Sequence, residues 1–168
     1  MAMEYNAQYW KDKLNLESHV EGGSFREIYR SQHVLPKEVL KPAHKGSRSV
    51  STSIYFLLEY GQFSAFHRIA SDEVWHFYDG SSLCVYEIRI DGQMVKHLLG
   101  KNIDSGENPQ VIIQAGSWFG SRVEEEGGYT LCGCTVAPGF DFQDFELAER
   151  EQLIQQYPQH SAIIKELT

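Results

Sequence analysis

The segment GQFSAFHRIASDEVWHFYDG, residues 61–80, is the most informative part of the chain about its fold. Two glycines enclose it, and apolar and polar side chains alternate along much of the sequence between them. Alternation with a period of two is typical of β-strands that bury one face. His67 lies six residues after Gly61, and Glu73 lies seven residues before Gly80. The alternation predicts two consecutive strands, one carrying the imidazole of His67 and the other the carboxyl group of Glu73.

The rest of the chain continues as short β-type runs at near-regular intervals. Glycine-bearing turns separate several of them, as at Tyr60-Gly61 and Asp91-Gly92. The expected strands span 50–60, 62–69, 73–78, 83–90, 94–99, 110–113 and 129–136, and residues 24–31 alternate in the same way. Strands of this length without interleaved helices predict an all-β sandwich or barrel.

Helical patterning is confined to the two ends of the chain. We expect a helical segment at about 5–16, where Tyr9, Trp10 and Leu14 can share a face, and C-terminal helices within about 146–166, interrupted at Pro158. No repeat, low-complexity tract or linker divides the 168 residues, a length that suits one domain. We therefore predict a single β domain over 1–168 with short terminal helices.

The composition excludes several classes of protein. Hydrophobic residues make up 42% and charged residues 23%, as in ordinary soluble proteins. A net charge of −8 argues against nucleic-acid and anionic-membrane partners. No run approaches the roughly 20 apolar residues of a membrane span, and the N-terminus lacks the apolar segment of a signal peptide. Three cysteines are an odd set, which favours a reducing compartment. We expect a cytoplasmic location.

The candidate site centres on His67 and Glu73. Along a strand His67 shares a face with Ile69, and Glu73 shares one with Trp75. If adjacent strands bring the two groups together inside a barrel, a carboxylate beside an imidazole forms an acid/base unit. The alternative is a buried hydrogen bond that only holds two strands in register. Both interpretations stay open at this point.

Several further segments make the chain resemble an uncharacterised cupin family that is often labelled sugar-epimerase-like. They are Glu21-Gly22-Gly23-x-Phe25-x-Glu27-x-Tyr29-Arg30, Ser53-Ile54-Tyr55-Phe56-Leu57-Leu58, Ser64-x-Phe66-His67, Asp72-Glu73-x-Trp75-His76, Ala115-Gly116-x-Trp118 and Cys134-Thr135-Val136-Ala137-Pro138-Gly139-Phe140. The resemblance covers nearly the whole chain. It implies a double-stranded β-helix, or jelly roll, that forms a homodimer and has a cavity lined from these segments.

Metal-binding cupins carry further histidines where this chain has Ile69 and Phe119. Catalytic zinc and iron sites generally need three protein ligands, and His67 with Glu73 supply two. We therefore predict no metal and no other cofactor at the usual position. A non-standard site could still use His76, or Cys132 and Cys134.

The epimerase label refers to deoxysugar-nucleotide 3,5-epimerases, in which a histidine removes a proton beside a keto group and a tyrosine returns one. The resemblance implies that His67 is the base, with Glu73 orienting it. Tyr55 completes the expected catalytic set, and Tyr29 and Tyr129 are other candidate proton donors. Ser64 stands where those epimerases carry an arginine, which puts recognition of a nucleotide diphosphate in doubt.

Aromatic faces with polar tips suit sugars and other small polar rings. The expected ligand contacts are Tyr29, Ser64, His76, Trp118 and Tyr129. Three functions are open: a metal-independent isomerase or epimerase of a sugar-like carbonyl compound, a ligand-binding module without catalysis, and a metal-dependent enzyme. The sequence predicts a small-molecule ligand in each case.

Overall fold

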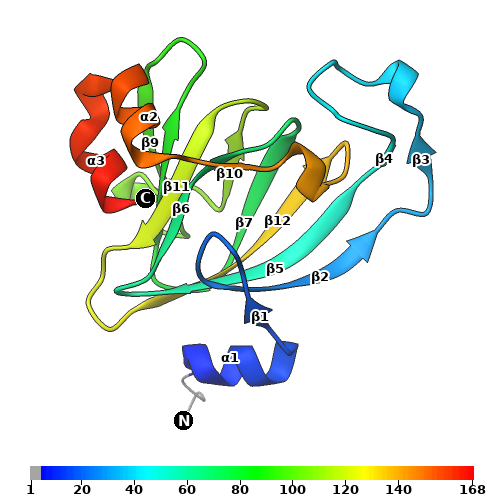
Figure 1. Ribbon diagram of the computed structural model, residues 1–168. Helices are drawn as coiled ribbons and strands as arrows, with labels where there is room; N and C mark the ends of the chain where they lie inside the picture. Colours follow the sequence, from blue (N-terminus) through cyan, green and yellow to red (C-terminus); the bar gives the residue numbers. More distant parts are fainter. Residues whose placement is uncertain (1–4) are drawn as a thin grey trace.

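The computed structural model describes residues 5–168, in which two antiparallel sheets face each other (Figure 1). One sheet has six strands in the order β1-β2-β5-β12-β7-β10. Its strands are β1 (Glu17–Ser18), β2 (Ser24–Arg30), β5 (Thr52–Glu59), β7 (Asp72–Gly80), β10 (Gln110–Ile113) and β12 (Tyr129–Ala137). The other has the order β13-β6-β11-β8-β9. Its strands are β6 (Phe63–Arg68), β8 (Leu83–Ile88), β9 (Met94–Leu99), β11 (Trp118–Val123) and β13 (Glu146–Leu147).

The main core lies between the two sheets, because alternate side chains of each strand point inward. Trp75 of β7 packs edge-on against Phe56 of β5 and against Phe119 of β11, with ring centroids 5.8 and 6.4 Å apart. All three rings are almost fully buried. The predicted all-β jelly roll of the cupin type is thus confirmed.

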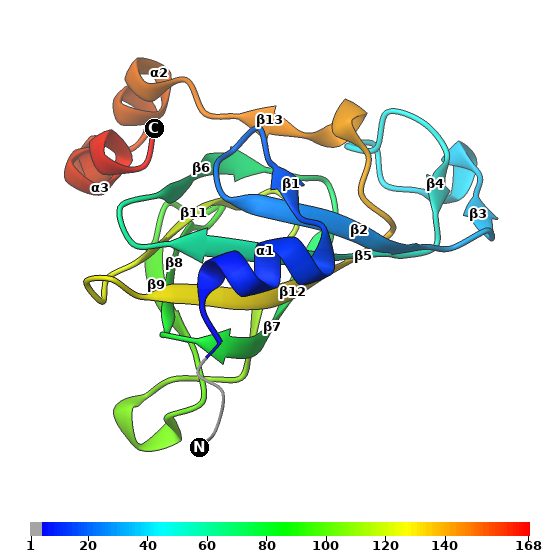
Figure 2. The ribbon, with the colours of Figure 1, turned by 90° about the horizontal axis from the view of Figure 1, so that it is seen from below.

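Short helices cover the outer faces of both sheets. Helix α1 (Ala7–Leu14) lies across β5 and β12 (Figure 2), where Ala7 packs against Leu57 and Leu131. Helices α2 (Arg150–Gln156) and α3 (Ser161–Glu166) pack against the outer face of the five-stranded sheet through Leu153 and Ile164. No helix within residues 5–168 is long and apolar enough to cross a membrane.

Smaller elements complete the chain. Strands β3 (Val34–Leu35) and β4 (Arg48–Ser49) form a two-stranded sheet at one end, and single 3₁₀ turns connect other elements. The 3₁₀ turns are η1 (Lys37–Val39), η2 (Ile103–Ser105), η3 (Phe142–Asp144) and η4 (Pro158–His160).

Residues 138–149, here called the strap, lead from β12 of one sheet to α2 on the other sheet (Figures 1 and 2). The strap contains η3 and β13, and β13 pairs with β6 through Glu146 opposite Arg68 and Leu147 opposite His67. A helix was expected from residue 146, but the first C-terminal helix begins at Arg150. Pairing with the edge of β6 holds residues 146–147 in an extended conformation.

The expected strands occur close to their predicted limits, and β11 is an additional strand that the sequence pattern did not indicate. A Cβ placed on Gly120 would lie 2.9 Å from the backbone oxygen of Ser64. Strand β11 therefore needs a glycine at this position to lie closely against β6. Glycine and serine at the centre of β11 weaken the apolar alternation by which strands are recognised.

Candidate functional site

A cavity of about 230 Å³ lies between the sheets, and the strap forms one of its walls. Most of its polar lining comes from ionisable side chains, while apolar groups line the remainder. The polar residues are His19, Glu21, Glu27, Arg30, Thr52, His67, Glu73 and Asp141, and the others are Phe25, Ile54, Ile69, Cys134, Val136, Phe140 and Phe142. So many ionisable groups beside a largely apolar surface mark the cavity as the candidate site.

His67 is fixed on β6 by contacts on several sides and is only 3% exposed. Its ring packs against Phe119 and Phe145, at centroid distances of 4.1 and 5.3 Å. Nδ1 lies 2.7 Å from the carbonyl oxygen of Ala65. Because a carbonyl oxygen only accepts hydrogen bonds, Nδ1 carries the hydrogen. Nε2 is therefore left to face the carboxyl group of Glu21, whose Oε2 lies 3.0 Å away.

Glu21 reaches His67 from the loop between β1 and β2. The backbone N–H of Ala65 donates to the carbonyl oxygen of Glu21 at 2.7 Å, which ties the loop to β6. Gly22 follows with a φ of +110°, and a Cβ there would lie 2.0 Å from the carbonyl oxygen of Phe63. The hydroxyl of Ser64 donates to Oε1 of Glu21 at 2.9 Å. Glycine and serine therefore position this carboxyl group.

Burial shifts the proton affinities of both partners. It raises the pKa of Glu21 to about 7, because the cavity disfavours the carboxylate. It lowers the pKa of His67, although the hydrogen bond to the Ala65 carbonyl and the charge of Glu73 oppose this shift. Burial thus brings the pKa of Glu21 into the neutral range, where general acid–base catalysis is most effective, and favours the neutral form of the His67 ring.

His19 is a second imidazole in the cavity, and sequence reasoning missed it. The backbone N–H of Glu21 donates to its Nδ1 at 3.3 Å. Burial lowers the pKa of His19, which favours the neutral ring. With Nδ1 accepting a hydrogen bond, a neutral His19 carries its hydrogen on Nε2. A neutral imidazole N–H of this kind can polarise a carbonyl oxygen.

Glu73 lies on β7, so it belongs to the sheet opposite His67. The two residues share the cavity as predicted, but they approach across it from two sheets and not from neighbouring strands of one sheet. Burial raises the pKa of Glu73 to about 7, and Cys134 on β12 forms a hydrogen bond with its side chain. The carboxyl group that contacts the His67 ring is Glu21, which takes the orienting position predicted for Glu73.

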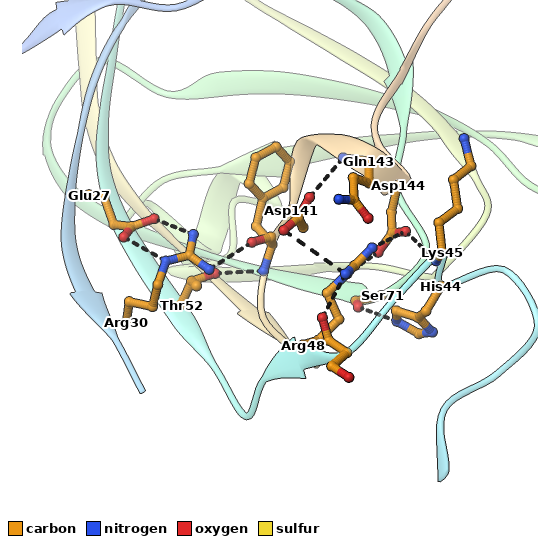
Figure 3. Close-up of polar contacts among 12 residues, drawn as sticks. Glu27, Arg30, His44, Lys45, Arg48, Thr52, Ser71, Asp141, Gln143 and Asp144 are labelled. Atoms are coloured by element: carbon orange, nitrogen blue, oxygen red, sulfur yellow. Dashed lines mark hydrogen bonds and ion pairs between the residues drawn. The ribbon is translucent and has the colours of Figure 1, made fainter. Parts of the chain in front are cut away.

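The mouth of the cavity carries an ion pair. Arg30 binds Glu27 through two hydrogen bonds, Nε to Oε1 at 2.9 Å and Nη2 to Oε2 at 2.7 Å, and its Nη1 donates to the Phe140 carbonyl oxygen at 3.1 Å. Figure 3 shows this guanidinium between β2 and the strap. The arginine thus joins the mouth to the strap, and its charge is matched by Glu27.

A second arginine holds the strap further along (Figure 3). Arg48 is 4% exposed and donates to both oxygens of Asp144, each at 2.6 Å. The backbone N–H of Lys45 also donates to Asp144, at 2.8 Å. On the outer side of this part of the strap lies a groove lined in part by Lys45, Asp144 and Phe145, and Ile69 lines both the groove and the cavity. One side chain thus separates the two spaces at that point.

Of the predicted ligand contacts, Ser64 acts indirectly, through its hydrogen bond to Glu21. The proposed proton donor Tyr55 lies on the opposite face of β5 from Ile54, and its ring packs against Tyr78 at 6.0 Å. Strand alternation therefore directs it away from the cavity, which corrects the expectation for this residue. Trp118 also points away from the cavity, because the side chain of its neighbour Phe119 points inward.

Tyr29 and His76 also lie outside the cavity. A register shift between Glu27 and Tyr29 in β2 reverses the alternation, so Arg30 lines the cavity and Tyr29 is 54% exposed. His76 points to the outer face of β7, where its Nε2 lies 3.1 Å from the hydroxyl of Thr135. Neither residue can contact a ligand in this cavity.

Tyr129 belongs to a separate network beside α1. Its hydroxyl donates to Asp79 at 2.6 Å, and the Trp10 indole N–H also donates to Asp79, at 2.9 Å. Tyr129 therefore helps to attach the N-terminal helix to the sheet. With Tyr29 and Tyr55 also outside, no tyrosine among residues 5–168 lines the cavity.

The residues of the cavity do not suit a metal at the usual cupin position. Ile69 and Phe119 occupy two of the usual ligand positions with apolar side chains. Within residues 5–168 no three histidine, cysteine, aspartate or glutamate side chains converge as a metal site would require. The reactive groups of the cavity are therefore its own acids and bases.

Two solved structures are similar to this chain along nearly its whole length. A protein from Shewanella oneidensis shares 41% identity with a TM-score of 0.87, and the alignment covers 98% of each chain. A hypothetical protein from Leishmania major shares 34% identity with a TM-score of 0.90, and the alignment covers 98% of this chain and 99% of that one. Neither name states an activity.

More distant structures show the fold alone. A cupin 2 domain-containing protein from Halorhodospira halophila is 12% identical, with a TM-score of 0.52 over 85% of this chain and 83% of that chain. No curated protein matches the sequence. A family model described as "Cupin superfamily (DUF985)" matches residues 8–148, which is most of the chain. The chain therefore belongs to this family of the cupin superfamily.

Proposed function

We propose that the protein binds a small carbonyl compound in this cavity and moves a proton at the carbon next to the carbonyl group, as an isomerase or epimerase does. The observation that carries the proposal is the close contact between the Glu21 carboxyl group and the His67 ring. Its Nε2–Oε2 distance is 3.0 Å, and the opposite ring nitrogen of His67 is committed to Ala65. No metal is required for this chemistry.

The proton count of the pair explains why it can act as a base. When Glu21 is ionised and His67 is neutral, a lone pair of Nε2 faces a carboxylate oxygen, and this arrangement gains stability from one proton placed between them. The proton of a ligand C–H bond is transferred to this shared position. The C–H electron pair forms a carbon–carbon double bond while the carbonyl oxygen becomes an enolate oxygen.

His19 completes the arrangement as a hydrogen-bond donor. Its Nε2–H stabilises the enolate oxygen, as neutral imidazole groups do where negative charge develops. The shared proton of Glu21 and His67 then returns to the ligand. Return to the neighbouring carbon, while the hydroxyl proton on the first carbon passes to the enolate oxygen, gives an isomer. Return to the same carbon gives an epimer when the enol turns over in the cavity before it is protonated. Both outcomes restore the ionised carboxylate and neutral imidazole.

Transfer of solvent deuterium into the ligand tests this function. The purified protein is incubated in D₂O with a panel of small keto and hydroxyketo compounds, and C–H exchange is followed by NMR. We expect exchange in at least one compound, reduced about 100-fold or more in Glu21→Gln and His67→Ala, because each removes half of the base. His33→Ala and Glu38→Gln, on the exposed surface, are the matched controls.

Absence of exchange across the panel would leave ligand binding without catalysis, the second function that the sequence left open. Thermal-shift screening of the same compounds distinguishes that outcome. A compound that raises the unfolding temperature and is recovered without deuterium would identify a binding module. Exchange that is unchanged in both cavity variants would contradict the proposed base.

A further inference from the structure

Glu73 is a buried carboxyl group that lacks a strong hydrogen-bond donor. It is 8% exposed and lines the cavity, and the thiol of Cys134 supplies its hydrogen bond. Among residues 5–168 no nitrogen or hydroxyl group donates to its side chain. Buried carboxylates are otherwise paired or multiply hydrogen-bonded, because leaving water is costly. Glu73 therefore has unfilled capacity for a donor, and it is directed at the space a ligand occupies.

The charge of the cavity indicates which donor fits. Four carboxyl groups line it, those of Glu21, Glu27, Glu73 and Asp141, against the single guanidinium of Arg30. Arg30 is already bound to Glu27 and to the strap carbonyl. An anionic ligand would thus meet repulsion without a free cationic partner. A ligand with a positive charge would be attracted.

Three aromatic rings strengthen the preference for an organic cation. Phe25, Phe140 and Phe142 line the same cavity, and aromatic faces attract ammonium groups. A metal cation would need three converging protein ligands, which residues 5–168 do not offer. An ammonium group needs only one carboxylate and donates up to three hydrogen bonds.

We propose that the cavity selects compounds that carry a primary ammonium group, which binds the carboxylate of Glu73. The inference rests on the proposed function and names its substrate class: a small amino-substituted carbonyl compound with an apolar body. Glu73 then holds the amine from one sheet, while Glu21 and His67 act on a C–H bond from the other side.

Matched probes test the charge preference directly. Benzylamine, benzyl alcohol and benzoate have similar bodies and differ in the charge of one group. Titration calorimetry or ligand-observed NMR at pH 8 is expected to give benzylamine an affinity at least about ten-fold above that of benzyl alcohol, with benzoate weakest. Equal binding of amine and alcohol, or no binding of any probe at millimolar concentration, overturns the proposal.

Variants assign the preference to Glu73. Glu73→Gln keeps the shape of the side chain but is expected to bring benzylamine down to the affinity of the alcohol, while Glu38→Gln on the surface keeps the full difference. A Glu73→Gln protein that retains the amine preference contradicts the assignment. Circular dichroism and thermal unfolding verify that each variant is folded.

A second measurement uses the wild-type protein alone, in case Glu73→Gln does not fold. The groups that face Glu73 are His67 from β6, Glu21 from the β1–β2 loop and Cys134 from β12. At pH 5.5 Glu73 and Glu21 are largely protonated and the cavity loses negative charge, so benzylamine binding is expected to weaken several-fold relative to pH 8. Binding that is unchanged or stronger at pH 5.5 overturns the proposal.

The two proposals can fail separately. His67→Ala is expected to lose deuterium exchange while it keeps the preference for benzylamine. An amine preference without exchange in any compound would reject the isomerase chemistry and keep the ligand class. Exchange in neutral compounds without an amine preference would reject the ligand class and keep the isomerase chemistry.

Discussion

Arg48 and Asp144 are joined by two hydrogen bonds of 2.6 Å, with both side chains at most 5% exposed. The pair joins β4, in the small β3–β4 sheet, to the strap. Removing one member leaves the other charge buried without its partner, which is more costly than the pair itself is stabilising.

We therefore expect Asp144→Asn to lower the free energy of unfolding by about 3 kcal/mol, measured by urea denaturation. Glu146→Gln is the control on the same strap. Its partner Arg68 is exposed, so this change is expected to cost about 0.5 kcal/mol. Similar losses in both variants would show that burial does not govern these ion pairs.

Gly22 gives a second prediction, because its backbone both turns the chain and approaches β6. In Gly22→Ala the new methyl group would meet the Phe63 carbonyl oxygen at 2.0 Å, at a φ of +110°. We expect a loss of more than about 3 kcal/mol, since the loop must move as well as adopt an unfavourable conformation. Glu21 would move with it, so exchange activity should fall too.

Gly61 is the matched control for this change. Its φ is +82°, yet a Cβ there would have no atom within 4 Å. Gly61→Ala is expected to cost only the left-handed conformation, about 1 kcal/mol. Equal unfolding midpoints for the two alanine variants would contradict the role assigned to the loop contact.

Stability should also depend on pH through the buried carboxyl groups. The pKa values of Glu21 and Glu73 are raised to about 7 in the folded protein, from ordinary values of 4.5. The folded state then holds protons that the unfolded chain has released. Their contribution to stability is complete below about pH 4.5 and is lost as the pH rises through 7.

Histidines shift stability in the opposite direction at lower pH. Burial lowers the pKa values of His19 and His67, so stability falls as the pH drops below 6.5. From pH 6.5 to 8 the carboxyl effect is unopposed by these two histidines. We expect the free energy of unfolding to decrease over that range, by about 1 kcal/mol for each carboxyl group.

Glu73→Gln tests the source of this slope. An amide does not titrate, so urea denaturation at pH 6.5 and 8 should show a smaller decrease in Glu73→Gln than in the wild type. Glu38→Gln should leave the decrease unchanged. A wild-type protein that is more stable at pH 8 would contradict the raised pKa values.

Tyr55 separates the structure-based site from the one that the sequence suggested. Because its side chain lies on the outer face of β5, Tyr55→Phe is expected to leave deuterium exchange within about two-fold of the wild-type rate, a difference of about 0.4 kcal/mol in the barrier. The same assay applied to His67→Ala provides the contrast. A loss in Tyr55→Phe comparable to that in His67→Ala would place the chemistry elsewhere.

Much of the fold was predictable from the sequence, because strands with one buried face alternate and their turns contain glycine. The site was less predictable, since side-chain direction depends on details of pairing. One register shift in β2 places Arg30, and not Tyr29, in the lining of the cavity. Trp118 was predictable as a residue outside the cavity, because its neighbour Phe119 stands at an inward-facing ligand position and adjacent strand residues point to opposite faces.

The partner of His67 shows a different limit. Glu21 was noted in a family segment, but nothing local indicates that a loop 46 residues away folds onto β6. The adjoining Gly22-Gly23 pair was the available signal, since such glycines often mark close backbone approach. The homodimer and the cytoplasmic location stay predictions.

The position of Ile69 bears on the wall between the cavity and the groove on the outer side of the strap. Among residues 5–168 its side chain is the one that the linings of the cavity and the outer groove share. Shortening it to alanine would remove most of the side chain that borders both spaces, and the wall between them would become thinner at this position.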